Sequence, residues 1–313
     1  MGLRCYNSLI VMNKKLTVRI PATSANMGPG FDCLGIALDI WNTVSILEDS
    51  LDSPGVMVIG NGQGELSSGT DNLIFQSFSH LFDELGEKTP NVTLECENRI
   101  PLARGMGSSS AALVGGLFAA NEYAGKPLSQ LDLLEIAAGL EGHPDNVASA
   151  LLGGMQISVY EEGHMVTASV PFPESLSVVL YVPDTPMPTE EARGLLDSNV
   201  ARSEAVFNIG RAALLVHAMS TGQLEYLRYA TQDALHQPAR QKIFFPMKNI
   251  IKAAMDSGGL GAFLSGSGST VLAFCTDREY TIGYEMADAG MKSGVNGEII
   301  VTSPTCGGAF LSS

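Results

Sequence analysis

The sequence contains few basic residues. Of 313 residues, 18 are Lys or Arg and 33 are Asp or Glu, which gives a formal net charge of −15. Nucleic acids and anionic membranes are bound through basic surfaces, so this composition argues against both as partners. It also limits how an anionic nucleotide could be held. Backbone N–H groups, helix dipoles and a divalent metal ion must contribute more to its binding than lysine side chains.

Cysteine is scarce as well, and its spacing fits no metal site. The cysteines are far apart and include no C-x-x-C pair. An odd number of scattered cysteines in a chain of this size predicts free thiols in a reducing cytosol. The first sixteen residues lack the apolar region of a signal peptide, which agrees with a cytoplasmic location. The five cysteines are Cys5, Cys33, Cys96, Cys275 and Cys306.

The sequence lacks a convincing membrane-spanning segment. The uncharged run at residues 257–276 is long enough to raise the question, but its Gly and Ser content predicts a buried strand, turn and strand instead. With 45% apolar and 16% charged residues, the chain can bury a sizeable core. Its length fits one large domain or two smaller ones.

Residues 101–112, PLARGMGSSSAA, form a glycine- and serine-rich loop that leads into an alanine-rich segment. Gly105 and Gly107 allow a tight turn and a close approach of the backbone to a ligand. The three serines that follow stand where a helix begins, and the first turn of a helix offers unpaired N–H groups. The pattern predicts a phosphate site. The loop has no lysine and Ser110 replaces a third glycine, so it is neither a Walker loop nor a complete GxGxxG motif.

Strands and helices alternate without a strict βαβ repeat, which favours an α+β fold. A proline-containing boundary near residues 171–173 suggests an N-terminal extension at 1–14, a first domain at 15–170 and a second at 171–313. Apolar patterning predicts strands near residues 16–20, 34–47, 55–59, 91–97, 176–182, 271–275 and 298–302, and helices near 72–85, 108–124, 128–140, 147–152, 189–197, 202–220, 223–235 and 247–257.

Four short segments combine glycine or charged residues with other polar residues inside apolar surroundings. Buried polar groups need partners, so four such clusters are best explained by one shared site. The segments are residues 21–35 (PATSANMGPGFDCLG), 101–112, 141–146 (EGHPDN) and 259–270 (GLGAFLSGSGST).

Three of these segments, PATSANMGPGFD, PLARGMGSSSAA and GAFLSGSGST, resemble the three motifs of the GHMP small-molecule kinases. The segment EGHPDN is similar to the H-x-D-N segment of the homoserine kinases within that superfamily. The resemblance covers nearly the whole chain. It implies a GHMP kinase fold, with an N-terminal α/β domain that carries a left-handed βαβ-type nucleotide site and a C-terminal ferredoxin-like domain. It also implies transfer of the γ-phosphate of ATP, with Mg²⁺, to the hydroxyl of L-homoserine on the route to threonine.

The resemblance implies a role for each residue of the donor site. Ser109 would offer its hydroxyl to Mg²⁺, which also needs a carboxylate. Glu135 is preferred for it, because its spacing to Asp145 matches that of the family's metal glutamate, and Glu141 is the alternative. The residues expected to surround the ATP phosphates are Pro101, Leu102, Ala103, Arg104, Gly105, Met106, Gly107, Ser108, Ser109, Ser110 and Ala111.

The acceptor implied by the resemblance is an amino acid, so its site needs an acidic and a basic group. By the family's pattern, Asn26, Asp32 and His143 form the ammonium side, and His143 has the alternative of a structural role. Arg193 and Arg240 match the arginines that hold the carboxylate, with Thr189 one helical turn before Arg193. Without the resemblance, each arginine is as well explained by a surface ion pair.

Asn146 is the candidate for positioning the acceptor hydroxyl. Asp145 is a candidate general base, although phosphoryl transfer depends mostly on positioning and charge neutralisation and need not use a strong base. Alternative acceptors are mevalonate, a diphosphocytidyl-erythritol or shikimate, which lack an ammonium group for Asp32. A metabolite-binding protein without catalysis and a scaffold protein are further alternatives. The sequence leaves the oligomeric state open, with a homodimer as one option.

Overall fold

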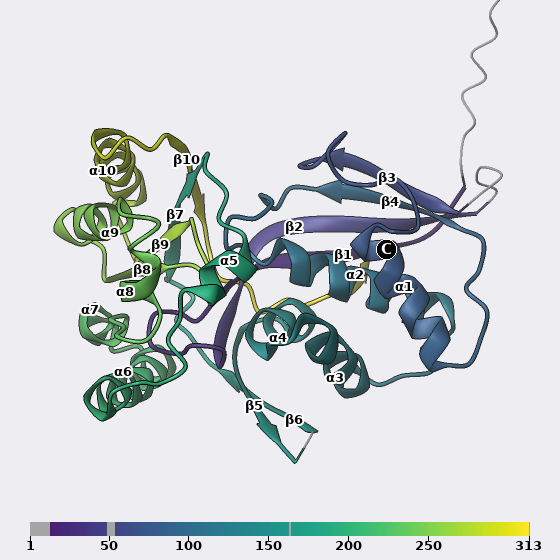
Figure 1. Ribbon diagram of the computed structural model, residues 1–313, viewed down its shortest axis with the longest axis horizontal. Helices are drawn as coiled ribbons and strands as arrows, with labels where there is room; N and C mark the ends of the chain where they lie inside the picture. The colour runs from purple at the N-terminus through teal and green to yellow at the C-terminus, as the bar shows by residue number, and fades with distance from the viewer. Residues whose placement is uncertain (1–12, 49–53, 163, 313) are drawn as a thin grey trace, which may run out of the picture.

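The computed structural model describes residues 13–48, 54–162 and 164–312 (Figure 1). These residues form two β-sheets, one built mainly from the first half of the chain and one from the second. Helices α1 to α4 gather beside the first sheet, and helices α6 to α10 lie at the opposite end of the molecule (Figure 1). The predicted extension at residues 1–14 lies outside the described residues except for its last two, which begin strand β1.

The first sheet has seven strands, six of them from residues 13–170. Its path runs β11-β1-β2-β4-β3, and β5 pairs with both β2 and β6. Only β3 and β4 are parallel, and the helix α1 (Leu73–Glu84) connects them. The strands are β1 (Asn13–Ala25), β2 (Leu34–Glu48), β3 (Gly55–Gly60), β4 (Thr93–Asn98), β5 (Met155–Glu161) and β6 (His164–Val170).

Helix α2 (Ser108–Tyr123) is rich in alanine and glycine because it packs closely against its neighbours. A Cβ on Gly116 would lie 2.4 Å from the carbonyl oxygen of Ile74 in α1, and one on Gly115 would lie 3.0 Å from Ile20 of β1. The helix is buried along most of its length, so its first turn is fixed by the core around it. Helices α3 (Gln130–Glu141) and α4 (Pro144–Leu152) follow.

The second sheet is antiparallel with the order β10-β7-β9-β8, and α9 (Met247–Asp256) and α10 (Glu279–Lys292) are its helices. This βαββαβ arrangement confirms the ferredoxin-like expectation. Its strands are β7 (Ser177–Pro183), β8 (Gly261–Leu264), β9 (Val271–Cys275) and β10 (Gly297–Thr302). Five short or long helical segments lie between β7 and α9 in the chain: α5 (Thr189–Gly194), α6 (Arg202–Thr221), η1 (Leu224–Tyr226), α7 (Leu227–Ala230) and α8 (Gln237–Arg240).

The structure differs from the predicted elements in several places. Strand β1 does not end at Pro21 but continues to Ala25, with a shift of register between Pro21 and Ala22 that accommodates the missing N–H group. The helix predicted near residues 223–235 is only two short turns, η1 and α7. The β5–β6 hairpin and α10 were not predicted. Neither was β11 (Phe310–Ser312), which returns to pair with β1 in the first sheet.

Candidate active site

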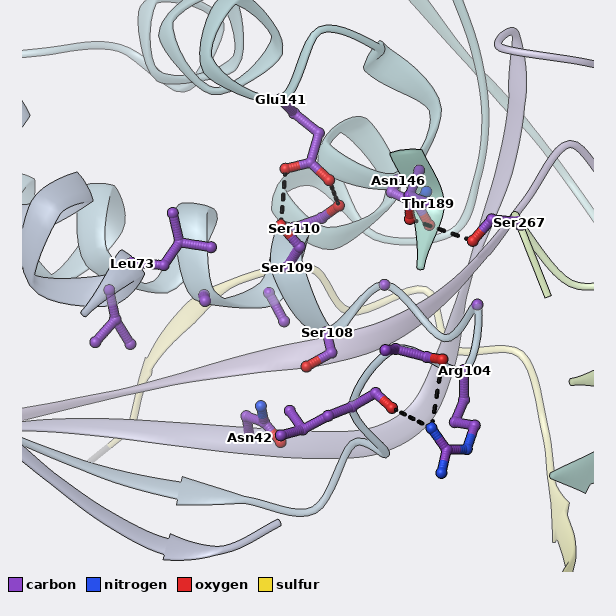
Figure 2. A pocket seen from close by; sticks show the side chains of 18 of the residues that line it. Asn42, Leu73, Arg104, Ser108, Ser109, Ser110, Glu141, Asn146, Thr189 and Ser267 are labelled. Carbon is purple, nitrogen blue, oxygen red and sulfur yellow. Dashed lines mark hydrogen bonds between the residues drawn. The ribbon is translucent and has the colours of Figure 1, made fainter. Parts of the chain in front are cut away.

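A cavity of about 430 Å³ lies where the four polar segments meet (Figure 2). Asn26 and Asp32 come from the β1–β2 connection, and the phosphate loop comes from the β4–α2 connection. The junction of α3 and α4, the start of α5 and the β8–β9 turn complete the walls. The structure therefore brings together segments that are up to 240 residues apart in the chain, as the hydrogen bond from Asn26 to Gly266 illustrates.

The carbonyl groups of the phosphate loop are bonded to the surrounding fold. Each of four successive carbonyls accepts a hydrogen bond from another segment, which leaves the N–H side of these peptides as donors for an anion. The donors include segments 21–35 and 259–270, so these two segments fix the shape of the loop. The bonds are Met187 N to Ala103 O (3.0 Å), Thr270 N to Arg104 O (3.0 Å), Ser265 Oγ to Gly105 O (2.6 Å) and Thr23 N to Met106 O (3.1 Å).

Gly105 and Gly107 are required by this packing. Both have a positive φ, of +73° and +70°. A Cβ on Gly105 would lie 2.1 Å from the carbonyl oxygen of Ser265, and one on Gly107 would lie 1.9 Å from Thr23 Oγ1. Helix α2 begins directly after Gly107, which supplies no side-chain cap. The N–H groups of the first turn are therefore left for a ligand, as the sequence predicted.

Two hydroxyls of the first turn of α2 face one carboxylate (Figure 2). Ser109 Oγ lies 3.2 Å from Glu141 Oε2, and Ser110 Oγ lies 3.0 Å from Glu141 Oε1. Glu141 is the last residue of α3, and its side chain is only 10% exposed. Carboxylate and hydroxyl oxygens are ligands that Mg²⁺ accepts.

Glu135 is not part of this group. Its carboxylate lies 3.3 Å from His164 Nδ1 and 3.4 Å from the backbone nitrogen of Met165, on the side of α3 that faces β6. Glu135 and Glu141 are on the same helix, and six residues turn the helix by about 240°, so the two side chains face different ways. The structure therefore separates Glu135, the preferred metal ligand, from Ser109 and places the alternative, Glu141, beside Ser109.

The start of α4 holds three of the predicted residues in contact with one another. Asn146 Oδ1 accepts a hydrogen bond of 2.7 Å from Thr23 Oγ1. Asp145 Oδ1 accepts from the backbone N–H of Asn146 (2.9 Å) and lies 3.2 Å from His143 Nδ1. Burial lowers the pKa of His143, but its hydrogen bond to the carboxylate of Asp145 and the charges of Asp145 and Glu141 outweigh burial, and the pKa is raised. The cluster is held as a unit beside the phosphate loop.

Asp32 and Arg193 form a two-pronged ion pair at the cavity wall. Arg193 Nη1 and Nη2 lie 3.1 and 2.5 Å from the two carboxylate oxygens of Asp32. Asn26 orients the turn, since its Oδ1 accepts from the backbone N–H of Asp32 at 3.0 Å. Thr189, at the start of α5, lies 3.2 Å from Ser267 Oγ (Figure 2). The predicted ammonium and carboxylate partners therefore also contact each other.

Arg240 is almost completely buried, at 1% exposed. Burial, followed by the charge of Arg193, lowers its pKa to about 10, so it keeps its charge at neutral pH. Its Nη1 donates to the carbonyl of Gly266 (2.9 Å) and to His236 Nδ1 (2.8 Å). The Nε atoms of Arg193 and Arg240 are both buried without a hydrogen-bond partner.

The side chain of Arg104, one of the residues expected to surround the ATP phosphates, is bonded to the protein itself. Its guanidinium donates to four carbonyls, those of Pro183 (2.7 Å), Leu102 (3.0 Å), Asp184 (2.5 Å) and Ala103 (3.5 Å). These bonds tie the loop to the end of β7, so the side chain is engaged with protein. Its peptide remains part of the loop.

The apolar end of the cavity lies between α1 and the first sheet. Residues 72–74 line it together with Val44, Val56 and Cys96. Asn72 also caps α1, because its side chain accepts from the backbone N–H of Ile74. The apolar side chains of this end suit a planar base, and the same cavity extends to the phosphate loop.

Sequence reasoning missed several residues that support the site. Thr23 and Ser265 lie inside recognised segments, but only the fold shows that their hydroxyls bond Asn146 and the phosphate loop. Phe31 lies beneath both arginines, with its ring centroid 5.5 Å from the guanidinium carbon of Arg193 and 5.7 Å from that of Arg240. Its position beside Asp32 in the sequence was the available signal.

Within the described ranges, no helix is both long enough and apolar enough to cross a membrane.

The sequence is similar to the GHMP kinases and to several homoserine kinases. Residues 72–154 match the model of the GHMP kinases N terminal domain, and residues 212–288 match that of the GHMP kinases C terminal domain. The homoserine kinase of Desulfitobacterium hafniense is 43% identical over 293 residues, covering 93% of this chain and 98% of that protein. The homoserine kinase of Moorella thermoacetica is 40% identical over 294 residues, covering 94% and 99%.

Solved structures show the same relationship. The crystal structure of homoserine kinase from Cytophaga hutchinsonii superposes with a TM-score of 0.86 at 27% identity, covering all of both chains. A mevalonate diphosphate decarboxylase from Staphylococcus aureus shares the fold alone, with a TM-score of 0.68 at 15% identity over 96% of this chain and 98% of that one. From its motifs, its fold and its similarity over nearly the full length, the chain belongs to the homoserine kinases of the GHMP kinase family.

Proposed function

We propose that the protein is an ATP-dependent homoserine kinase, which phosphorylates the side-chain hydroxyl of L-homoserine. One observation carries the proposal: a single cavity joins a lysine-free phosphate loop to two arginines and an aspartate. The loop suits a nucleotide, and the charged residues suit an acceptor that has both an ammonium and a carboxylate group. Relatives at 40–43% identity are named homoserine kinases, which supports the same assignment.

The donor half would bind ATP through the backbone of the loop and the first turn of α2. Glu141 and the hydroxyl of Ser109 would hold Mg²⁺, and Ser110 shares the same carboxylate. Among the residues that the structure describes, no three His, Cys, Asp or Glu side chains cluster as a metal site, so the ion would take its other ligands from phosphate and water. When bound, Mg²⁺ supplies positive charge against the transferring phosphoryl group.

The acceptor half would hold L-homoserine by its charged ends. A carboxylate bound between Arg193 and Arg240 would give the unpartnered Nε groups acceptors, which removes the cost of buried donors without hydrogen bonds. Asp32 would take the ammonium, and its pairing with Arg193 keeps it in place for that contact. Mevalonate and shikimate carry no ammonium, so this half favours an amino acid.

Asn146 would position the hydroxyl that receives the phosphoryl group. Its Oδ1 is already engaged by Thr23, so its amide N–H₂ is the end that remains for the substrate. Asp145 is the nearby carboxylate that can take up the hydroxyl proton, while its Oδ1 orients the backbone of Asn146 and the ring of His143. The transition state is loose, so these residues act mainly by placing the two reactants in line.

An ADP-release assay with Mg²⁺–ATP tests this proposal. L-homoserine, mevalonate and shikimate are offered as acceptors at equal concentrations, and the product is identified as O-phospho-L-homoserine. We expect turnover with L-homoserine alone. ATP binding without turnover of any acceptor would contradict the kinase assignment, and preferred turnover of mevalonate or shikimate would contradict the acceptor.

A further inference from the structure

His236 stands next to Arg240 in a position that no motif of the donor site explains. It precedes α8, and Arg240 follows it four positions later, so the two side chains lie on the same face of one helical turn. His236 is fully buried, and its Nδ1 is 2.8 Å from Arg240 Nη1. Together with the carbonyl of Gly266, it provides the hydrogen bonds that hold the guanidinium.

The hydrogen bonds of His236 define its protonation state. Its Nε2 is 2.8 Å from the carbonyl oxygen of Gly28, which can only accept, so the proton lies on Nε2. Nδ1 then carries a lone pair and accepts from Arg240. Burial, above all, lowers the pKa of His236 to about 4, so the ring is neutral at physiological pH. Arg240 is therefore held by an acceptor that carries no charge.

The ring of His236 is itself held rigidly. Phe31 stacks on it, with ring centroids 5.5 Å apart and an interplanar angle of 29°. The buried carboxylate of Asp233 accepts from the backbone N–H groups of His236 (3.0 Å) and Gln237 (2.7 Å). Asn208 donates to the other oxygen of Asp233 at 2.7 Å. The histidine is thus fixed by its backbone and by both edges of its ring.

We propose, on the basis of the proposed function, that His236 is a positioning residue that orients Arg240 toward the carboxylate of the acceptor. A long guanidinium side chain loses rotamer entropy when it is ordered, and His236 and Gly266 order it before the substrate binds. A carboxylate in the place of His236 would also order Arg240, but it would pair with the guanidinium and compete with the substrate. A neutral acceptor fixes the direction and leaves the positive charge for the ligand.

Three variants at this position separate orientation from simple packing. His236→Gln keeps a neutral acceptor, His236→Leu removes it, and His236→Glu introduces a competing charge. We expect the KM for L-homoserine to rise in the order Gln, Leu, Glu, with His236→Leu about tenfold above the wild type. The KM for ATP stays close to the wild-type value in all three. Thermal unfolding of each variant checks that it is folded.

A double-mutant cycle tests whether His236 acts through Arg240. In an Arg240→Met background, His236→Leu should leave the KM for L-homoserine unchanged. The acceptor 3-aminopropan-1-ol, which is homoserine without its carboxylate, provides a second readout. His236→Leu should lower the preference for L-homoserine over this alcohol, measured as the ratio of kcat/KM values, by about tenfold.

The outcomes are distinguishable from failure of the proposed function. Wild-type turnover of L-homoserine with strong preference over 3-aminopropan-1-ol supports the function, and its absence contradicts it. Given that turnover, His236 has no positioning role if His236→Glu binds L-homoserine as well as His236→Gln does. The same conclusion follows if His236→Leu raises the KM values for ATP and L-homoserine equally, or adds a further effect to Arg240→Met.

Discussion

The donor and acceptor halves of the cavity are built by different physical means. The donor half uses peptide groups, glycines and hydroxyls, and the carboxylate of Glu141 faces two of its serines. The acceptor half uses charged side chains, and its two arginines share the face of Phe31. The first half derives its positive potential from backbone dipoles, whereas the second derives it from two guanidinium groups.

This difference shows how an acidic chain can bind two anionic groups in one cavity. Peptide dipoles provide a phosphate site without side-chain cations, so the few arginines are available for the carboxylate of the acceptor. A substitution in the donor half should consequently change kcat and the Mg²⁺ dependence, and one in the acceptor half should change the KM for L-homoserine.

Replacement of Glu141 in the donor half should cause the largest loss of activity. Glu141→Gln removes the charge beside Ser109 and Ser110 while keeping a similar shape, and we expect kcat to fall about a thousandfold because the metal loses its protein carboxylate. The Mg²⁺ concentration that gives half-maximal rate should rise as well. Steady-state kinetics over a Mg²⁺ titration measures both values.

Glu135→Gln is the matched control for this experiment, because it makes the same change six residues earlier on the same helix. It should leave kcat and the Mg²⁺ dependence close to the wild type, since Glu135 contacts His164 and Met165. A large loss in Glu135→Gln together with a small one in Glu141→Gln would restore Glu135 as the metal ligand.

Arg240→Met should weaken binding of the acceptor and leave binding of ATP intact. Loss of charge-assisted hydrogen bonds to the carboxylate should raise the KM for L-homoserine about a hundredfold, with the KM for ATP little changed. Arg211→Met, at an arginine that bonds Gln232 and the carbonyl of Phe207 outside the cavity, is the control. Equal losses for both substrates would mean that Arg240 supports the fold instead.

The neutral state of His236 should make stability depend on pH. The pKa of His236 is about 4 in the folded protein, below its usual value of 6.5. Between these two pH values the unfolded chain is protonated at this histidine and the folded protein is not. Stability from this group is complete above about pH 6.5 and is lost as the pH falls toward 4, which amounts to about 2 kcal/mol between pH 7 and pH 5.

Denaturant unfolding of wild type and His236→Gln at pH 7 and pH 5 measures this contribution. The charged groups whose fields reach the ring are Asp233, Arg240 and Asp32. They are present in both proteins, so the comparison isolates the histidine. The wild type should lose more stability than the variant on acidification. An equal loss in the two proteins would show that His236 does not titrate as described.

Thr23→Val should have the smallest effect. The change removes the hydroxyl that donates to Asn146 but keeps the size and shape of the side chain. We expect kcat to fall about fivefold, because one neutral hydrogen bond that positions the amide is lost. Thr17→Val, which removes a hydroxyl bonded to Ser45 elsewhere on β1, is the control. Unchanged kcat in Thr23→Val would mean that Asn146 needs no such support.

The two halves of the cavity could be predicted from the sequence for different reasons. The phosphate loop could be identified because its glycines and the start of α2 are adjacent in the chain, and their spacing reflects local backbone geometry. Glu141 could not be selected over Glu135, because the choice depends on how α3 is rotated against α2. Spacing measured along the chain does not contain that rotation.

The acceptor half depends on contacts over long distances in the chain. The pairing of Asp32 with Arg193 spans 161 residues, and the bond of His236 to Gly28 spans 208. Family resemblance pointed to both arginines, but it did not reveal that His236 and Phe31 hold them. The β11 strand was missed for a similar reason, since three residues with little pattern become a strand only by pairing with β1.

A crystal structure with L-homoserine, Mg²⁺ and a non-hydrolysable ATP analogue tests the separation of the two halves most directly. We expect Mg²⁺ bound to Glu141 and Ser109 beside the phosphates, with the acceptor carboxylate on Arg193 and Arg240 and the acceptor hydroxyl next to Asn146. Mg²⁺ bound to Glu135, or an acceptor carboxylate that contacts neither arginine, would contradict this expectation.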